Sequence, residues 1–446
     1  MTARSLSSRE GVRARAHRPF GVLVTTASLA LPATAFAGNE EGVLFGSEAS
    51  LVAGAVTATT SEGSALWYNP AGIASVSNNR LDVSGSVFML RAHHVGAFLI
   101  APGEGSAPAT ISEIVSIPAA GTYVRRLGAR VHIAAGVFVP SHTDYTLRAS
   151  YETRAGAQWV NTETVLTDDT HAGVGLGVEI TPTLRVGASL FGVYRSASGS
   201  SQLLGGTLSA GMSDSFSSVS SIHAYRSVSF EAGLGVQWSP HRALRVGVSL
   251  RSPGVQIYEG ADVTEVIAMG TASGTARFTP NLYSGGDFGV GVVTPFKVRA
   301  GVAWTGERAS VSVDADVATA LSPQYADPRA FNWNVRVGGR YRLRDQLAIG
   351  YGFFTDRSPY RDDGVTGERR LDFYGGTVGV EFGNSLTVVN APAPTLTFAT
   401  TIGLRYAYGS GEVDAMQVDA GNVIHTVPAV VTVHEVGVNV GSTLRF

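Results

Sequence analysis

The chain has 446 residues, of which 44% are hydrophobic and 15% are charged, and its formal net charge is −2. A net charge this close to zero excludes the strongly basic footprint of a nucleic-acid-binding protein. Cysteine is absent, which excludes a disulfide framework, a thiolate metal site and a cysteine nucleophile.

The first 37 residues have the anatomy of a secretory signal peptide. Five arginines precede an apolar stretch at residues 20–31, and Ala35, Phe36 and Ala37 form a small-x-small cleavage site. The apolar stretch is too short to span a bilayer as a helix. The sequence therefore predicts export and cleavage after residues 1–37, while the long basic region leaves the true start codon open.

Residues 38–78 are rich in Gly, Ala, Ser and Thr and show no strand-like alternation. Near their end stand Asn69, Pro70 and Ala71, where Asn tolerates turn conformations and Pro cannot continue a regular element. We expect this segment to plug the lumen of a barrel formed by residues 79–446, with the turn against the wall near Pro140. Trp67 and Tyr68, just before the turn, either pack between plug and wall or contact a ligand, and packing is the favoured interpretation.

From residue 79 onward the dominant pattern is period two. Val298, Ala300 and Val302 alternate with Lys297, Arg299 and Gly301, and the same alternation recurs at 244–251, 310–317 and 347–353. Alternation at this period indicates strands with one apolar and one polar face.

The alternating segments number fourteen, an even number as bacterial single-chain barrels have. The predicted strands are residues 80–93, 113–126, 129–148, 157–180, 184–200, 216–239, 244–266, 290–305, 308–320, 331–344, 346–358, 369–383, 395–416 and 430–446.

Three features indicate an all-β, antiparallel transmembrane barrel rather than a soluble sandwich. One face of each strand is aliphatic, the other carries Arg, Asp and Gly, and aromatic residues such as Trp304, Tyr351 and Tyr406 lie near strand ends. In hydrocarbon an open sheet edge would leave backbone groups without partners, so the sheet must close. Many strands exceed the ~9–11 residues that span a bilayer and are expected to project on one side.

Short and long connections alternate between the predicted strands. Tight polar turns fall near residues 181–183, 239–242, 306–308 and 343–346, and long Gly, Ser and Asp-rich loops are expected at 196–214, 268–287, 356–369 and 409–428. This alternation is typical of periplasmic turns and extracellular loops. The final strand ends in Phe446, which resembles the signal for the barrel-assembly machinery, and it is expected to pair with the first strand.

The chain resembles the FadL family of outer-membrane transporters for long-chain fatty acids and other hydrophobic compounds. The resemblance covers nearly the whole chain after residue 37. Its strongest part is the small-residue segment leading to Asn69-Pro70-Ala71, which looks like the NPA signature of the family. The further similar segments are residues 123–127, 136–140, 250–253 and 335–343.

The resemblance implies a passive transporter in the bacterial outer membrane, in contact with lipid and lipopolysaccharide, that works as a monomer without a cofactor. A fatty-acid-like ligand would be held in the barrel interior, gated by the N-terminal hatch, and released laterally at a kinked third strand. The kink would fall at Phe138, Val139 and Pro140, because Pro removes a ladder donor.

The family's ligand-carboxylate residues do not align to particular positions. Arg245, Arg299 and Arg336 are candidates because they share the polar face of their strands. The alternative is that they are ordinary wall charges balanced by Asp314 and Asp316, since polar residues are the default on the inner face of a barrel.

No enzyme or metal site is predicted. Ser141, His142 and Asp144 include the residue types of a hydrolytic triad, but neighbouring strand residues point to opposite faces and cannot meet. The glycines at 173, 175 and 177 lie in a strand with no helix after it, so they favour close packing against the plug rather than a dinucleotide loop.

Three other functions remain open. A general porin would lack a tight plug, a structural or adhesive barrel would act through its long loops, and an outer-membrane hydrolase would depend on Ser141.

Overall fold

A computed structural model describes residues 42–101, 105–152, 156–207, 215–271, 276–285, 294–321, 329–360, 370–386, 396–418 and 424–446. The predicted signal peptide, residues 1–37, lies outside the described residues. Three short helices precede the first strand: α1 (Ser47–Leu51), α2 (Ala65–Tyr68) and the 3-10 helix η3 (Pro70–Ser75). Among the described residues, no helix has the length and hydropathy needed to cross a membrane.

The rest of the described chain consists mostly of strands. They are β1 (Arg80–Ala101), β2 (Gly105–Arg126), β3 (Val131–Glu152), β4 (Ala157–Thr181), β5 (Leu184–Thr207), β6 (Ser215–His241), β7 (Leu244–Arg251), β8 (Val255–Thr271), β9 (Ala276–Gly285), β10 (Lys297–Thr305), β11 (Ala309–Ala318), β12 (Asn332–Arg344), β13 (Leu347–Asp356), β14 (Leu371–Leu386), β15 (Leu396–Val418) and β16 (Ile424–Arg445).

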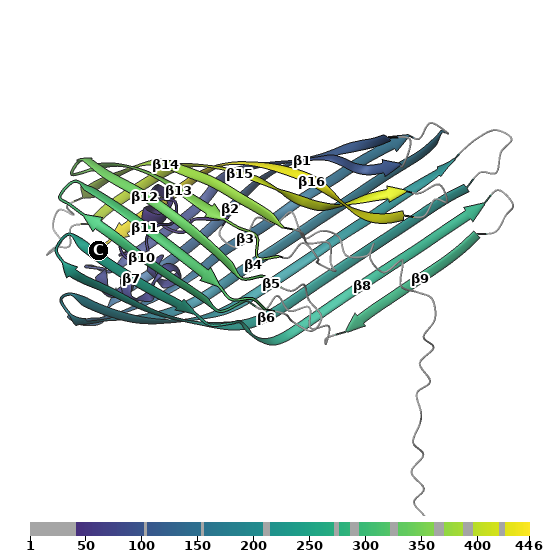
Figure 1. Cartoon of the computed structure of the whole chain (residues 1–446). Coiled ribbons are helices and arrows are strands. Elements are labelled where there is room, and N and C mark those ends of the chain that lie inside the picture. The colour runs from purple at the N-terminus through teal and green to yellow at the C-terminus, as the bar shows by residue number, and fades with distance from the viewer. Residues whose placement is uncertain are drawn as a thin grey trace, which may run out of the picture.

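The strands close into a barrel (Figure 1). Each strand from β1 to β7 pairs antiparallel with the next, β7 pairs with β10, and the ladder continues to β16. β16 pairs with β1 from Arg445–Arg80 to Val431–Val95, and the Phe446 N–H donates to the Asn79 carbonyl at 3.0 Å. The predicted fourteen-stranded antiparallel barrel and the pairing of its last strand with its first are confirmed.

β8 and β9 are an addition to this ring. β7 pairs with the lower part of β6, and β8 pairs with the upper part of the same strand. The sequence predicted one strand over 244–266, but the chain breaks at Ser252, Pro253 and Gly254. Pro253 has no N–H to donate to a ladder, so the strand ends and restarts as the β8–β9 hairpin.

Several predicted loops are paired strands instead. β1 and β2 form one hairpin through the expected gap at 94–112, β5 runs on to Thr207, and β16 begins at Ile424, inside the expected loop at 409–428. β15 ends at Val418, two residues beyond its predicted strand. The Gly and Ser content of these stretches suggested loops, yet small polar residues are compatible with the inner face of a barrel, where they line the lumen.

The barrel wall is uneven in height. β1 to β6, β15 and β16 have 22 to 27 residues, whereas β10 to β13 have 9 to 13. A strand rises about 3.3 Å per residue, so β1 is ~70 Å long, well beyond the ~9–11 residues that a bilayer requires. The longer strands project past the shorter ones at the end opposite the C-terminus (Figure 1).

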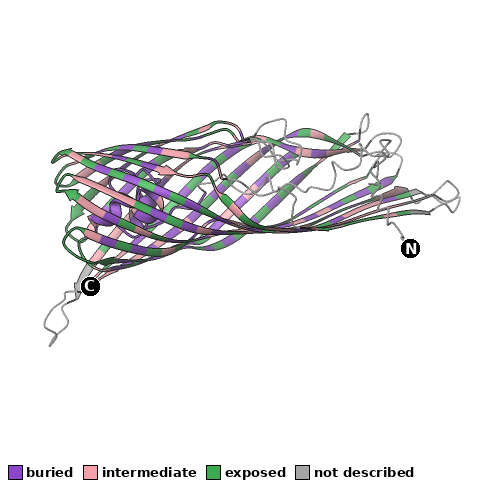
Figure 2. Cartoon of the chain, turned by 90° about the horizontal axis from the view of Figure 1, so that it is seen from below, coloured by how far each residue is buried: buried purple, intermediate pink, exposed green. Residues whose placement is uncertain are grey.

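Burial alternates along the strands, which gives the bands of buried and exposed residues in Figure 2. On β10, Arg299 and Ala303 are buried, while Val302 and Trp304 are about half exposed. On β13, Ile349, Tyr351 and Phe353 face outward. The apolar face of the sheet therefore lies outside and the polar face inside, as the period-two pattern predicted.

The wall is interrupted between β2 and β3. Their ladder runs from Arg126–His132 to Ala120–Phe138, and above that pair the two strands, described over their full lengths, are not paired. The β3–β4 ladder is also irregular, between Phe138 and Ser141. If the β2–β3 register continued, Pro118 would face Pro140, and neither has an N–H for a ladder. We call this interruption the seam.

Candidate functional site

Residues 42–79, here called the inner segment, lie within the barrel at the end where the C-terminus is found (Figure 1). Nearly all of them are buried. Asn69 fixes the segment to the wall, because its Nδ2 donates to the Val236 carbonyl of β6 at 3.0 Å and to the Thr57 carbonyl at 2.8 Å. Its Oδ1 accepts from the Ala71 N–H at 3.2 Å, which caps η3. The Asn69-Pro70-Ala71 turn thus joins two parts of the inner segment to β6.

Glycines on the inner face of the wall let the inner segment approach closely. A Cβ on Gly235 would lie 2.1 Å from Asn69 Oδ1, and one on Gly187 would lie 2.3 Å from the Pro70 carbonyl carbon. Gly177 approaches Ala74 in the same way. The turn therefore contacts β5 and β6, and the expectation that it lies near Pro140 is wrong. The expected packing of strand glycines against the N-terminal segment is confirmed at Gly177.

Polar contacts add to this packing. The Thr57 N–H and Oγ1 both donate to Asp314 Oδ2, at 2.8 and 2.6 Å. The Gly63 N–H donates to Asp82 Oδ2 at 2.8 Å.

Glu62 and Arg80 form a buried ion pair between the inner segment and β1, with Arg80 Nη2 3.0 Å from Glu62 Oε2. Burial raises the pKa of Glu62 to about 7; Arg80 acts in the opposite direction, while the carboxylates of Asp82 and Glu48 raise it further. This carboxyl therefore changes its charge near neutral pH while the segment is docked.

Trp67 lies in an aromatic cluster where the inner segment meets the seam. Its ring is 4.8 Å from that of Phe45, 5.4 Å from Phe138 of β3 and 5.0 Å from His171 of β4. Arg251 stacks on its face at 4.0 Å. Trp67 packs against the wall, as its place in the sequence predicted, and Phe138 links the cluster to the last residue pair below the seam.

The three predicted arginines face the inner segment at the low end of the barrel. Arg336 is 2% exposed and forms an ion pair with Asp316, and Arg299 lies over the Tyr68 ring at 5.3 Å. The Arg245 charge acts on the carboxyl of Glu48. The structure places them against protein groups of the inner segment and wall, and their role toward a ligand carboxylate stays a prediction.

A carboxylate bridges the seam higher up. Glu113 Oε1 of β2 accepts from the Asp144 N–H of β3 at 2.8 Å. The same carboxylate is 3.3 Å from Arg91, which also pairs with Glu435 at 2.6 Å. Side-chain contacts therefore hold β2 and β3 together where the backbone ladder is missing.

The outer face beside the seam carries an apolar groove with a volume of about 540 Å³. Gly121 and Gly192 are among its small residues, and its lining includes the exposed side chains of Tyr123, Leu190 and Phe230. Gly121 directly follows Ala120, the last paired residue of β2. The groove thus begins at the lower end of the seam.

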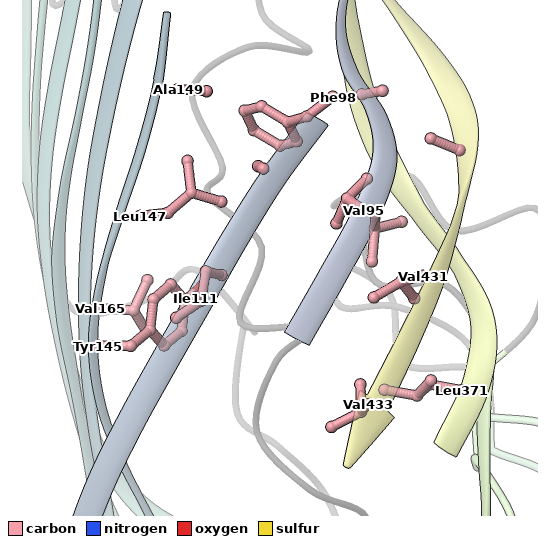
Figure 3. Packing of buried hydrophobic residues seen from close by; sticks show 14 of the residues in the cluster. Val95, Phe98, Ile111, Tyr145, Leu147, Ala149, Val165, Leu371, Val431 and Val433 are labelled. Atoms are coloured by element: carbon pink, nitrogen blue, oxygen red, sulfur yellow. The ribbon is translucent and has the colours of Figure 1, made fainter. Parts of the chain in front are cut away.

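The upper interior contains an apolar cluster that the sequence analysis did not identify. We call it the upper cluster; it draws on β1 to β5 and β13 to β16. Its larger members are Phe98, Leu99, Ile111, Tyr145, Leu147, Trp159, Phe354, Leu371 and Phe373. Side chains of β3 and β4 point toward those of β1, β14 and β16 (Figure 3). Phe98, Leu99 and Ile111 lie outside the predicted strands, whereas members such as Tyr145, Trp159 and Phe373 lie within them. Which of these inward residues meet depends on long-range pairing that the local pattern does not encode.

The tip of the β15–β16 hairpin contributes to the upper cluster. Above Val95–Val431 the ladder between β1 and β16 ends, and Leu99 of β1 instead pairs in parallel with Met416 of β15. Val413 on this hairpin is buried in the cluster. The hairpin tip therefore leaves the line of the wall and brings apolar side chains to the upper interior.

Two of the residue types considered for a hydrolytic triad contact other partners. His142 Nδ1 is 2.5 Å from Asp168 of β4, and Asp144 contacts Glu113 through its backbone. In the part of the chain that the structure describes, no group of three or more His, Asp or Glu side chains could hold a metal ion.

Solved structures with this architecture cover most of the chain. No family model and no curated protein matches the sequence. A FadL homologue from Pseudomonas aeruginosa has a TM-score of 0.58 and 13% identity, over 92% of this chain and 100% of that chain. The toluene transporter TodX from P. putida has a TM-score of 0.58 and 14% identity, over 92% and 99%. The toluene transporter TbuX from Ralstonia pickettii has a TM-score of 0.54 and 14% identity, over 92% and 99%. The chain shares the barrel fold of these proteins.

Proposed function

We propose that this chain is an outer-membrane barrel of the FadL family that carries hydrophobic small molecules passively across the outer membrane of a bacterium. The observation that carries the proposal is the seam between β2 and β3. A transmembrane sheet needs complete ladders because lipid offers no hydrogen bonds to the backbone. Backbone groups without ladder partners in an otherwise closed wall cost free energy. Such an interruption therefore calls for a functional reason.

The surroundings of the seam support an exit route into the lipid. On the inside, Phe138 and Trp67 form an aromatic contact directly below it. On the outside, the groove that contains Gly121 continues from it along the lipid-facing wall. An apolar molecule that leaves here moves from an apolar interior into hydrocarbon and never crosses water, which follows the hydrophobic driving force.

The inner segment supports a gating role. It lies beside the lower end of the seam, and its Asn69, Pro70 and Ala71 turn is tied to β6. We propose that residues 38–78 are a hatch whose displacement opens the route past Phe138, Val139 and Pro140. Arg245, Arg299 and Arg336 face this hatch, and contact between them and a ligand carboxylate would require it to move.

The names of the structurally similar proteins support the proposed class of ligand. They include two toluene transporters and a monoaromatic hydrocarbon channel. The proposed ligand is accordingly a hydrophobic small molecule, with long-chain fatty acids and monoaromatics as the two classes to test. We also propose that the barrel works as a monomer, contacts lipopolysaccharide, and is assembled through the C-terminal strand that ends in Phe446.

Uptake of radiolabelled oleate and toluene by cells that express the chain tests the proposal, in a host without transporters of this fold. We expect faster uptake of at least one probe than in cells with an empty vector. Purified protein in planar bilayers should show no large, steady ion conductance, because the inner segment fills the lower lumen. Large, steady channels without uptake of either probe would identify a general porin and contradict the proposal.

A further inference from the structure

The upper cluster contains one amide that does not fit its surroundings. Asn161 of β4 is fully buried, and neither its Nδ2 nor its Oδ1 has a hydrogen-bond partner among the described residues. Its partners across the ladders are Ala149 of β3 and Leu203 of β5, both members of the upper cluster. Buried amides normally have hydrogen-bond partners because desolvation without compensation is costly.

The direction of Asn161 follows from its strand. Trp159 and Val165, two and four residues away on β4, share its face and belong to the upper cluster. Figure 3 shows Val165, and Ala149 on the neighbouring strand, pointing toward the side chains of β1 and β16. Asn161 therefore presents the two N–H donors of Nδ2 and the acceptor Oδ1 to the apolar upper interior.

Polar residues continue from Asn161 across the neighbouring strands. Glu163, the next inward residue on β4, pairs with Ser201 of β5, and Ser201 pairs with Ser221 of β6. All three are buried. β4 to β6 therefore add polar residues to the upper interior, whereas the members of the upper cluster on β1, β2 and β16 are apolar.

The charges of this region do not favour an anionic ligand. Arg91 of β1, Arg195 of β5 and Arg405 of β15 are each within ion-pair distance of a carboxylate. Including the second partners Glu435 and Glu231, these three cations meet four carboxylates. Each of the three is therefore already paired within the protein, and a ligand carboxylate would have to compete with those partners.

We propose that the upper cluster binds an uncharged amphiphile, a mainly hydrocarbon molecule whose neutral polar group, such as a hydroxyl or carbonyl, hydrogen-bonds with Asn161. This inference rests on the proposed transport function and specifies the class of ligand. The apolar part lies against the members of the upper cluster on β1, β2 and β16, and the polar group supplies the hydrogen bonds that Asn161 lacks.

Trp159 provides the readout, because it is buried two residues from Asn161 on the same face. The probes are 2-bromo-1-decanol, 2-bromodecanoate and 1-bromodecane; bromine quenches tryptophan fluorescence on contact, and in the first two probes it lies next to the polar group. Quenching is measured on full-length protein in lipid nanodiscs, and the signal that a Trp159→Phe variant still shows is subtracted. We expect the alcohol to quench at about tenfold lower concentration than the other two probes, the equivalent of one net hydrogen bond.

Asn161→Leu should raise the concentration of alcohol needed for quenching by about tenfold. It should leave the concentration of 1-bromodecane needed for quenching unchanged. Removing an unsatisfied amide from an apolar site should not prevent folding. The matched control is Val160→Leu, one position along β4 on the lipid-facing side, which should change nothing. Tightest binding of the decanoate, no effect of Asn161→Leu, or no quenching of Trp159 by any probe would overturn the inference. Uptake of oleate or toluene in the cell assay would still support the transport function in each of these cases.

Discussion

The lower and upper halves of the barrel interior are built from different chemistry. The lower half holds a peptide: glycines such as Gly187 and Gly235 admit its backbone, and Asp314 and Asp82 accept its N–H groups. The upper half offers mainly aliphatic and aromatic side chains, with an amide at Asn161 that has no partner among the described residues. This difference indicates that the lower half is suited to retaining the inner segment. The upper half is suited to binding small apolar molecules.

The largest effect on ion conductance should come from Gly235→Leu, which disrupts the docking of the inner segment in the lower half. Its Cβ alone would lie 2.1 Å from Asn69 Oδ1, so the inner segment must move or leave the wall. We expect a cost of about 1–3 kcal/mol to docking, as for other overpacked sites. Planar-bilayer recordings should show ion-conducting openings that wild-type protein lacks.

The control for this variant is Gly96→Leu, because a Cβ at Gly96 would meet nothing within 4 Å. It should conduct no more than wild type. A Gly235→Leu protein that folds as a barrel and stays as closed as wild type would show that the lower half does not depend on close backbone packing.

A smaller effect should follow from pH through Glu62, the carboxyl of the inner segment that pairs with Arg80 of β1. The docked Glu62 has a pKa of about 7, above its ordinary value of 4.5. Between these values the docked state holds a proton that the undocked state releases, so docking weakens as pH rises from 4.5 to 7 and is constant above 7. Hydrogen exchange of residues 42–79, corrected for intrinsic rates, should be slower at pH 5.5 than at pH 8.

Glu62→Gln should reduce this pH dependence, because the amide does not ionise. Glu307→Gln, in an exposed turn, should leave it unchanged. Equal protection of the wild-type inner segment at both pH values would show that Glu62 does not govern docking. The charged groups that also act on Glu62 are Arg80, Asp82, Glu48 and Arg445, and they remain in both variants.

The barrel could be predicted from sequence because period two is a local signal. Strands such as 297–304 and 347–353 alternate without interruption, and their outward faces are apolar as expected. The strand at β15 was predicted to within two residues, whereas the upper parts of β5 and β16 were missed because the Gly and Ser nearby suggest loops. A hairpin partner stabilises such strands through long-range pairing.

The candidate site was less accessible to sequence reasoning. Pro140 indicated an irregular strand, but its relation to Pro118 depends on a register that only the pairing of β2 with β3 defines. The contact of Asn69 with β6, 167 residues away in the chain, has no local signal at all. Asn161 looked like one polar residue among many until the burial of its neighbours on β3 and β5 was known.

The central claim is that the ligand leaves the barrel through the seam. A cross-link between β2 and β3 across the seam tests this claim most directly. The chain has no native cysteine, so Ile114→Cys with Asp144→Cys places one thiol on each side of the seam. Val302→Cys with Val313→Cys is the matched control, because that outward-facing pair lies in the intact β10–β11 ladder, away from the seam and the groove. A short thiol cross-linker that joins Ile114→Cys to Asp144→Cys should abolish uptake of the transported probe, with recovery on reduction, while the control pair transports normally. Undiminished uptake through a fully cross-linked seam would contradict the account.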